Sequence, residues 1–174
     1  MKKLKLFIIL SLVISILLIL TMFIPLVDYQ GEASGETRQM AGLGIVFGIG
    51  SFRGFVGGKY VEIGLNGHPT ILLLIAYILP IILSVLLLIF KNRNKTIGYV
   101  LGGLLIAAFI FEAIMIFNVT GISSCKLEGK VVPLNQANCK NSVGAYIGGV
   151  GALLGALSSA AYVLFKYLSS KEEK

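Results

Sequence analysis

One carboxylate lies inside a long apolar stretch of this chain of 174 residues. Glu112 is the only charged residue between Thr96 and Ile122. An ionised carboxylate at the centre of a membrane helix costs at least about 2.5 kcal/mol. We therefore expect Glu112 to be a protonated acid that donates a hydrogen bond to Tyr146, Ser142 or a loop carbonyl. Such an acid either carries protons or counter-charge in a small transporter, or provides a hydrogen bond for helix packing.

The two cysteines, Cys125 and Cys139, are the second feature whose side chains could take part in a reaction. They lie 14 residues apart, around Glu128-Gly129 and Pro133. A single pair on an oxidising side of a membrane predicts a structural disulfide, which would contribute about 3 kcal/mol by closing a loop of this length. The alternative is a catalytic thiol pair. That chemistry usually needs a Cys-x-x-Cys spacing and a second redox pair or quinone site, and the sequence shows neither.

The rest of the sequence does not favour catalysis. The chain has one histidine, no cluster of ligands at metal-binding spacing, no Ser-His-Asp set and no phosphate-binding glycine loop between a strand and a helix. We therefore predict that the protein is not an enzyme and that it has no catalytic residues, no metal and no cofactor.

Four apolar runs must position these residues. A membrane-spanning helix needs about 20 apolar residues, and each run is long enough. The sequence therefore predicts an all-α transmembrane four-helix bundle, forming a single polytopic membrane domain over residues 1–174. The expected helices cover about residues 4–27, 69–90, 96–119 and 143–168. We expect the first to be a retained signal-anchor helix, because no small-x-small cleavage pattern precedes Asp28.

The basic residues give the expected orientation. Hydrophobic residues make up 56% of the chain and charged residues 13%, against about 25% charged in ordinary soluble domains. The formal net charge is +7. Nine of the fifteen basic residues flank the expected helices: Lys2, Lys3, Lys5, Lys91, Arg93, Lys95, Lys166, Lys171 and Lys174. Since such residues favour the cytoplasmic side, we expect a protein of the cell (cytoplasmic) membrane with both termini cytoplasmic.

This orientation predicts which side of the membrane each loop faces and what the positive charge contacts. The loop at 91–95 would face inward, and the loops at 28–68 and 120–142 would face outward. Positive charge beside helix ends indicates contact with membrane lipid, and we predict no nucleic-acid partner.

Small residues follow one face of the expected last helix. Glycine and serine at helical spacing let helix backbones approach closely in lipid. The stripe consists of Gly144, Gly148, Gly151, Gly155 and Ser159. We expect it to pack on the helix at 96–119, through Gly98, Gly102 and Gly103, or on a second copy of the chain.

The first outer loop has a two-residue period, which is typical of strands. Bulky residues alternate with small ones in an apolar row, Leu43, Ile45, Phe47 and Ile49, and a second alternation covers 60–65. Gly57-Gly58 would form the turn of a hairpin. We predict a small extracytoplasmic β-hairpin or sheet, preceded by an irregular segment at 28–39. The alternative is a re-entrant segment over 42–50.

This layout resembles the claudin-type tetraspan arrangement, with four spans, both ends inside and a β-bearing first outer loop. The chain departs from that family in two respects. The family has a hallmark Trp and a Cys pair in its first outer loop, whereas this chain has no Trp and its cysteine pair lies in the second outer loop. The resemblance implies an exposed sheet edge that can pair with another chain, and the apolar row is a candidate interaction surface.

Two functions follow as expectations. The first is a non-enzymatic membrane protein that presents its β-module for assembly, for adhesion or as an accessory subunit, with another membrane protein or a second copy as partner. The alternative is a small oligomeric transporter or channel that uses Glu112.

Overall fold

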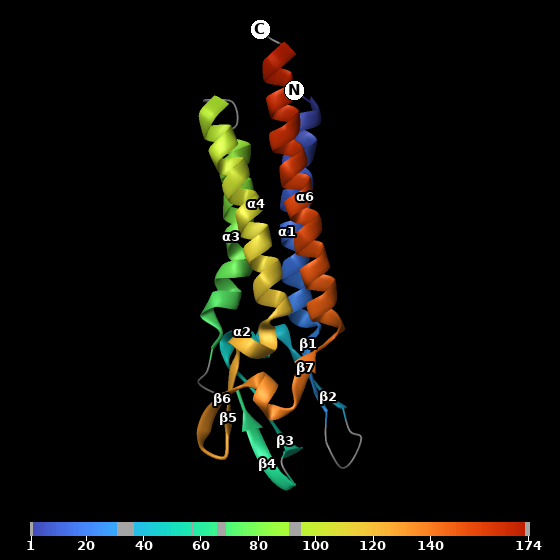
Figure 1. The fold of residues 1–174 in the computed structure, drawn as a ribbon, viewed down its shortest axis with the longest axis vertical. Coiled ribbons are helices and arrows are strands. Elements are labelled where there is room, and N and C mark those ends of the chain that lie inside the picture. The colour runs from blue at the N-terminus through green and yellow to red at the C-terminus, as the bar shows by residue number, and fades with distance from the viewer. Residues whose placement is uncertain (1, 31–36, 57, 66–68, 91–94, 173–174) are drawn as a thin grey trace. The chain divides into compact units, whose positions relative to one another are not determined.

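The structure is a computed structural model that describes residues 2–30, 37–56, 58–65, 69–90 and 95–172. Its described part is mostly helical, with small sheets (Figure 1). Among the described residues, four helices are long and apolar enough to cross a membrane: Leu4–Phe23, Ile71–Phe90, Thr96–Phe117 and Val143–Lys171. The four predicted helices are therefore confirmed, and they suggest a multi-pass membrane protein.

Short strands lie between the long helices along the described chain, before α3 and between α5 and α6. The helices are α1 (Lys2–Leu20), η1 (Thr21–Phe23), α2 (Gly42–Phe47), α3 (Ile71–Phe90), α4 (Lys95–Phe117), α5 (Val119–Ile122), η2 (Leu134–Ala137) and α6 (Val143–Glu172). The strands are β1 (Pro25–Gln30), β2 (Thr37–Ala41), β3 (Ser51–Val56), β4 (Lys59–Gly64), β5 (Ser124–Leu127), β6 (Lys130–Pro133) and β7 (Cys139–Asn141).

Local sequence explains where the first helix stops. Ile24 is extended, with φ −99° and ψ 161°, and it precedes Pro25. A residue before proline is driven out of the helical region by a clash with the proline ring. The helical segment therefore ends at Phe23, four residues before the predicted limit at residue 27.

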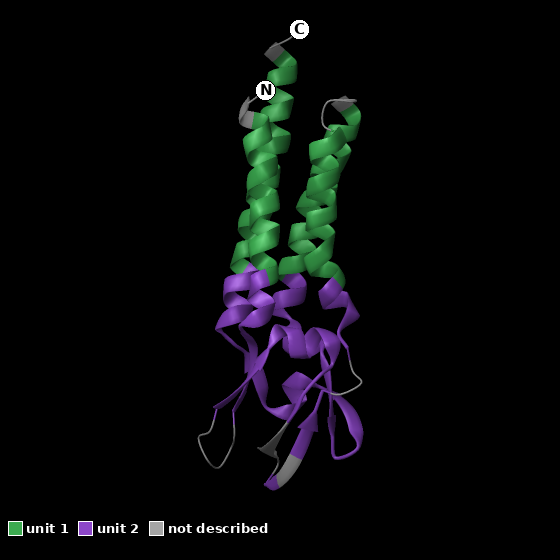
Figure 2. Cartoon of the chain, turned by 180° about the vertical axis from the view of Figure 1, so that it is seen from behind, with its two compact units in different colours: residues 1–19, 75–113, 150–174 green, residues 20–74, 114–149 purple. Residues whose placement is uncertain are grey.

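The chain forms two compact units (Figure 2). Unit 1 comprises residues 1–19, 75–113 and 150–174 and contains most of the four long helices. Unit 2 comprises residues 20–74 and 114–149 and contains every strand of the described chain.

The described part of unit 2 contains two antiparallel sheets. The first has three strands in the order β2-β1-β7, and the second has four in the order β3-β4-β5-β6. In the first sheet, Tyr29 of β1 lies opposite Arg38 of β2 and Cys139 of β7. In the second, Ser51 pairs with Gly64 across the β3–β4 hairpin. The core of the unit includes Leu26, Ile45, Ile63 and Leu134, which are all buried.

The predicted strand at 60–65 is confirmed as β4. Its hairpin turn includes Gly58, whose φ of +80° lies in the left-handed region that glycine adopts without strain. Gly57, the other expected turn residue, lies outside the described residues. The partner strand is β3, at Ser51–Val56, and not the segment at 42–50.

The strand predicted for 42–50 is wrong, because Gly42–Phe47 forms the helix α2. Gly42, Ile45 and Val46 are buried, and their i, i+3, i+4 spacing is that of one helical face. A Cβ at Gly42 would lie 2.7 Å from Leu26 Cδ1 and 2.9 Å from the Cα of Met22. The tertiary contact therefore requires glycine here, and the alternation of glycine with bulky residues does not mark a strand.

The described parts of the segment at 28–39 also differ from the prediction, whereas residues 31–36 lie outside the described residues. Residues 25–30 and 37–41 pair as β1 and β2, although neither segment alternates strongly. β1 pairs with its sequence neighbour β2 on one side and with the distant strand β7 on the other, and these pairings hold both segments in the extended conformation.

Candidate functional site

Glu112 lies in the part of α4 that belongs to unit 1, and its side chain has no exposed surface. Neither carboxyl oxygen has a hydrogen-bond partner among the residues that the structure describes. The expected bonds to Tyr146, Ser142 or a loop carbonyl are therefore wrong; the Tyr146 side chain is instead largely exposed. Glu112 is a buried acid that is not paired within the described chain, and such a group is costly unless it is protonated.

A group of serines joins α1 to α6 inside unit 1. The Ser11 hydroxyl lies 3.2 Å from the hydroxyl of Ser158 and 3.1 Å from that of Ser159. Ser158 donates to the Phe7 carbonyl, and Ser159 donates to Gly155. Hydrogen bonds of this kind hold helices together in lipid. The prediction included Ser159 alone, although the i, i+4 spacing of Ser11 and Ser15 was a usable signal for this contact.

The small-residue stripe of α6 meets more than one neighbour. Within unit 1, a Cβ at Gly151 would lie 2.8 Å from Leu18 Cδ2 of α1, and a Cβ at Gly155 would collide with the Phe109 ring of α4. Within unit 2, a Cβ at Gly144 would collide with the Pro25 carbonyl oxygen, and one at Gly148 would lie 3.3 Å from Ile116 Cδ1.

The expected neighbour helix, α4, also approaches α6 through glycine. A Cβ at Gly102 would lie 2.6 Å from Val163 Cγ2, and one at Gly98 would collide with Lys166. Gly103, by contrast, has no atom within 4 Å of an added Cβ among the described residues, so it makes no such approach.

The predicted disulfide is wrong, because Cys125 and Cys139 are both free and buried. They belong to different sheets: Cys125 on β5 lies opposite Val132, whereas Cys139 on β7 lies opposite Tyr29. The Cys139 thiol donates to the Ala137 carbonyl at 3.5 Å. The segment between the cysteines contains the β5–β6 hairpin, whose turn is at Glu128-Gly129, and then η2, which leads to β7 in the other sheet.

Burial also makes both thiols unreactive at neutral pH. Burial raises the pKa of Cys125 to about 11. Burial, followed by the proximity of Cys125, raises the pKa of Cys139 to about 12. Because the thiolate is the reactive form, neither cysteine is activated for nucleophilic or redox chemistry.

The apolar row at 43–49 does not form one surface. Ile45 is buried on α2, and Leu43 is half-buried. Phe47 and Ile49 are exposed. The two exposed side chains remain candidates for contact with another chain.

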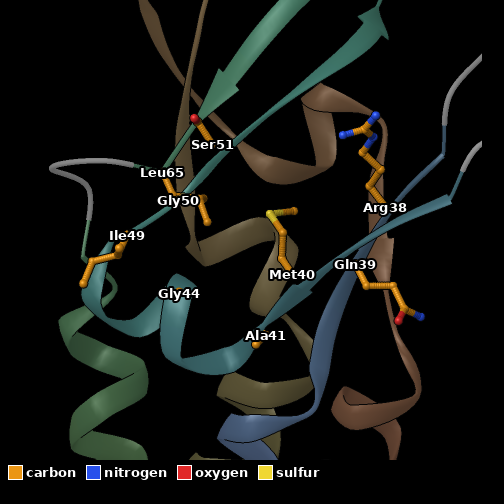
Figure 3. Close-up of a pocket in the computed structure, with 9 residues that line it drawn as sticks. All are labelled: Arg38, Gln39, Met40, Ala41, Gly44, Ile49, Gly50, Ser51 and Leu65. Atoms are coloured by element: carbon orange, nitrogen blue, oxygen red, sulfur yellow. The ribbon is translucent and has the colours of Figure 1, made fainter.

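A groove of about 390 Å³ lies beside the edge strand β2 (Figure 3). One wall consists of four successive strand residues, from Arg38 to Ala41. The opposite wall includes Gly44 of α2, the segment Ile49–Ser51 that enters β3, and Leu65 after β4. All of these residues belong to unit 2. The prediction missed this groove, because four separate chain segments create it and no single segment carries a signal for it.

Among the described residues, no three His, Cys, Asp or Glu side chains come together as a metal site. Comparison of the chain with protein-family models, with curated proteins and with solved structures found no match.

Proposed function

We propose that this chain is a non-enzymatic integral membrane protein whose unit 2 binds another protein chain, for assembly, for adhesion or as an accessory subunit. The supporting observation is that its two small sheets end in strands that pair on one side only within the described chain. Edge strands present rows of backbone N–H and C=O groups that can accept a further strand. The partner is another membrane-associated protein or a second copy.

The proposal includes an orientation. Basic residues flank the helices at both termini and around residues 91–95, and such residues favour the cytoplasmic side. Unit 2 would therefore face the outside of the cell membrane. Free thiols are compatible with that side, since burial keeps them protonated and away from oxidants.

Site-specific photo-crosslinking in native membranes tests this proposal. A photoreactive amino acid placed at Phe47 or Val131, two exposed positions of unit 2, should produce a crosslink to a protein. The matched controls are Ile82 and Leu164, which are exposed positions on the long helices. Crosslinks to protein from the helix positions alone, or from no position, would contradict the proposal.

A second function, transport through Glu112, has one specific observation in its favour. A buried carboxyl group without a partner lowers stability, so its presence in a membrane helix calls for a role beyond packing. In that case the side chain would take up and release a proton, or it would balance the charge of a cationic substrate, as part of an oligomer.

Flux measurements on purified protein in liposomes test this second function. Glu112→Gln keeps the size and polarity of the side chain but cannot release a proton. It should abolish a pH-dependent proton or cation flux while the circular dichroism spectrum is unchanged. Equal fluxes from both proteins, or none from the original chain, would leave Glu112 without a transport role.

A further inference from the structure

The groove beside β2 has the form of a strand-binding site. Its wall consists of consecutive residues of one edge strand, so the groove follows an extended backbone. β2 pairs with β1 on one side and has no strand on the other within the described chain. An extended peptide that lies in such a groove can hydrogen-bond to the exposed backbone and place alternate side chains in the groove.

The far wall is already shaped before any partner binds. The Ile49 N–H donates to the Gly44 carbonyl at 2.8 Å, and the Leu65 N–H donates to the Gly50 carbonyl at 2.8 Å. Gly48, the residue directly after α2, adopts the left-handed conformation with φ +64°. These local bonds hold the segment before β3 in place. Binding of a partner would therefore require little free energy to order this segment.

The lining indicates the side chains that a partner should carry. Met40 and Arg38 project to one side of β2, whereas Gln39 and Ala41 project to the other (Figure 3). Ile49 provides exposed apolar surface, Met40 and Leu65 line the groove as largely buried apolar residues, and Arg38 is the only charged residue of the lining. An extended segment with an apolar residue opposite Met40 and a carboxylate two positions away, opposite Arg38, would match this wall.

The other sheet edges fit this purpose less well. β6 contains Lys130 and Pro133, and both residue types block strand addition. β7 has only three residues. β3 borders the groove only at its first residue, Ser51. A second copy of β2 is also a poor occupant, because antiparallel self-pairing would bring two Arg38 side chains near each other.

From these features we infer that the groove between β2, α2 and the start of β3 binds an extended, acidic segment of another protein by strand addition. This inference rests on the proposed role of unit 2 in binding another chain and specifies where and how the partner binds.

Peptide binding to the full chain in nanodiscs tests the inference. The probe is a fluorescent seven-residue peptide, T-E-T-V-T-V-T, which has Glu and Val two positions apart on one face of a strand. It should bind, and its counterpart with Lys in place of Glu should bind about fivefold more weakly, the upper range for an exposed ion pair. N-methylation of one alternate set of amides should abolish binding, whereas methylation of the other set should not. That asymmetry is specific to pairing along one strand edge.

Variants of the chain locate the site. Ser51→Trp should fill the groove and reduce affinity at least tenfold, and Arg38→Glu should reduce it about fivefold. The matched controls are Gln136→Trp in η2 and Lys130→Glu in β6, which should have no effect. Both control positions are exposed and lie outside the groove.

Three results would overturn the inference. They are no binding up to about 1 mM peptide, the weak end of specific affinity, equal loss from both methylated sets, and equal effects of the groove and control variants. If the peptide fails while Phe47 and Val131 still crosslink to a protein, strand addition at β2 is wrong and the wider proposal stands. If the crosslinks fail as well, both are wrong.

Discussion

At the scale of single residues, the two cysteines and Glu112 have opposite properties. The thiols lie in sheets, and Cys139 donates to a carbonyl, whereas Glu112 has no hydrogen bond to the described residues. Burial keeps a thiol inert at little cost, because a protonated thiol behaves as a small apolar group. A carboxyl group without a partner is different, since its polar atoms lose water and gain nothing.

The thiol state gives a direct prediction. Protein that is unfolded without reductant should take up two maleimide labels, because the structure has two free thiols. In the folded protein, labelling at neutral pH should be slow. It should accelerate as pH rises toward about 11, the pKa to which burial raises Cys125, because the reactive thiolate then becomes populated. Mass spectrometry provides the count, and an unlabelled protein 2 Da lighter than its reduced form would show a disulfide instead.

Glu112 gives a prediction about stability. Glu112→Leu removes a buried polar group that has no partner in the described chain, so it should raise the free energy of unfolding in detergent by about 1–3 kcal/mol. Denaturation in mixed micelles measures this change. Glu112→Gln is the control, because it retains the buried polar atoms and should not stabilise the fold. A loss of stability with Leu would mean that the carboxyl group has a partner.

At the scale of elements, the glycines of the long helices divide into those that allow close approach and those that do not. Gly155 faces the Phe109 ring with no room for a Cβ, whereas Gly103 has open space around it. The two positions share a residue type and a helical setting, but the neighbouring helix gives them different roles.

A matched pair of substitutions tests this difference. Gly155→Ala should destabilise unit 1 by about 1–3 kcal/mol, because the added methyl group forces Phe109 out of place. Gly103→Ala should be neutral, or stabilising by about 0.5–1 kcal/mol, since alanine favours a helix over glycine. Denaturation midpoints of the two variants provide the comparison. Equal effects of the two would show that Gly155 does not form a tight contact.

At the scale of the whole molecule, four apolar helices suggest a multi-pass membrane protein. In the proposed orientation, four spans would place both termini on the same side of the membrane, and that side would be the cytoplasm because basic flanking residues favour it.

Topology reporters test the expected orientation. Phosphatase fusions at both termini should be inactive, whereas an insertion between Glu128 and Gly129, in the exposed turn between β5 and β6, should be active. The reason is that alkaline phosphatase, the reporter in these fusions, reaches its active fold only outside the cytoplasm. Carbonate washing should leave the protein in the vesicles. Opposite reporter results at the two termini would contradict an even number of spans.

The sequence alone determined the features that depend on local chemistry. The four spans follow from length and hydropathy, which are properties of each segment alone. The β4 strand and its turn at Gly58 also follow from local pattern and glycine conformation. The burial of Glu112 could be anticipated because this residue lies within an apolar span. Its lack of a partner in the described chain could not be anticipated.

Only the tertiary structure decided the features that depend on which segments meet. Gly42–Phe47 is a helix that buries Gly42, Ile45 and Val46, and Gly42 packs against Leu26 and the Met22 backbone, although the alternation of this segment resembles a strand. Cys125 and Cys139 are unbonded and lie in strands of different sheets, and the spacing of two cysteines in the sequence does not show which strands they join. The groove beside β2 exists because four separate segments converge on one strand edge, and no pattern within a single segment encodes the distance between segments.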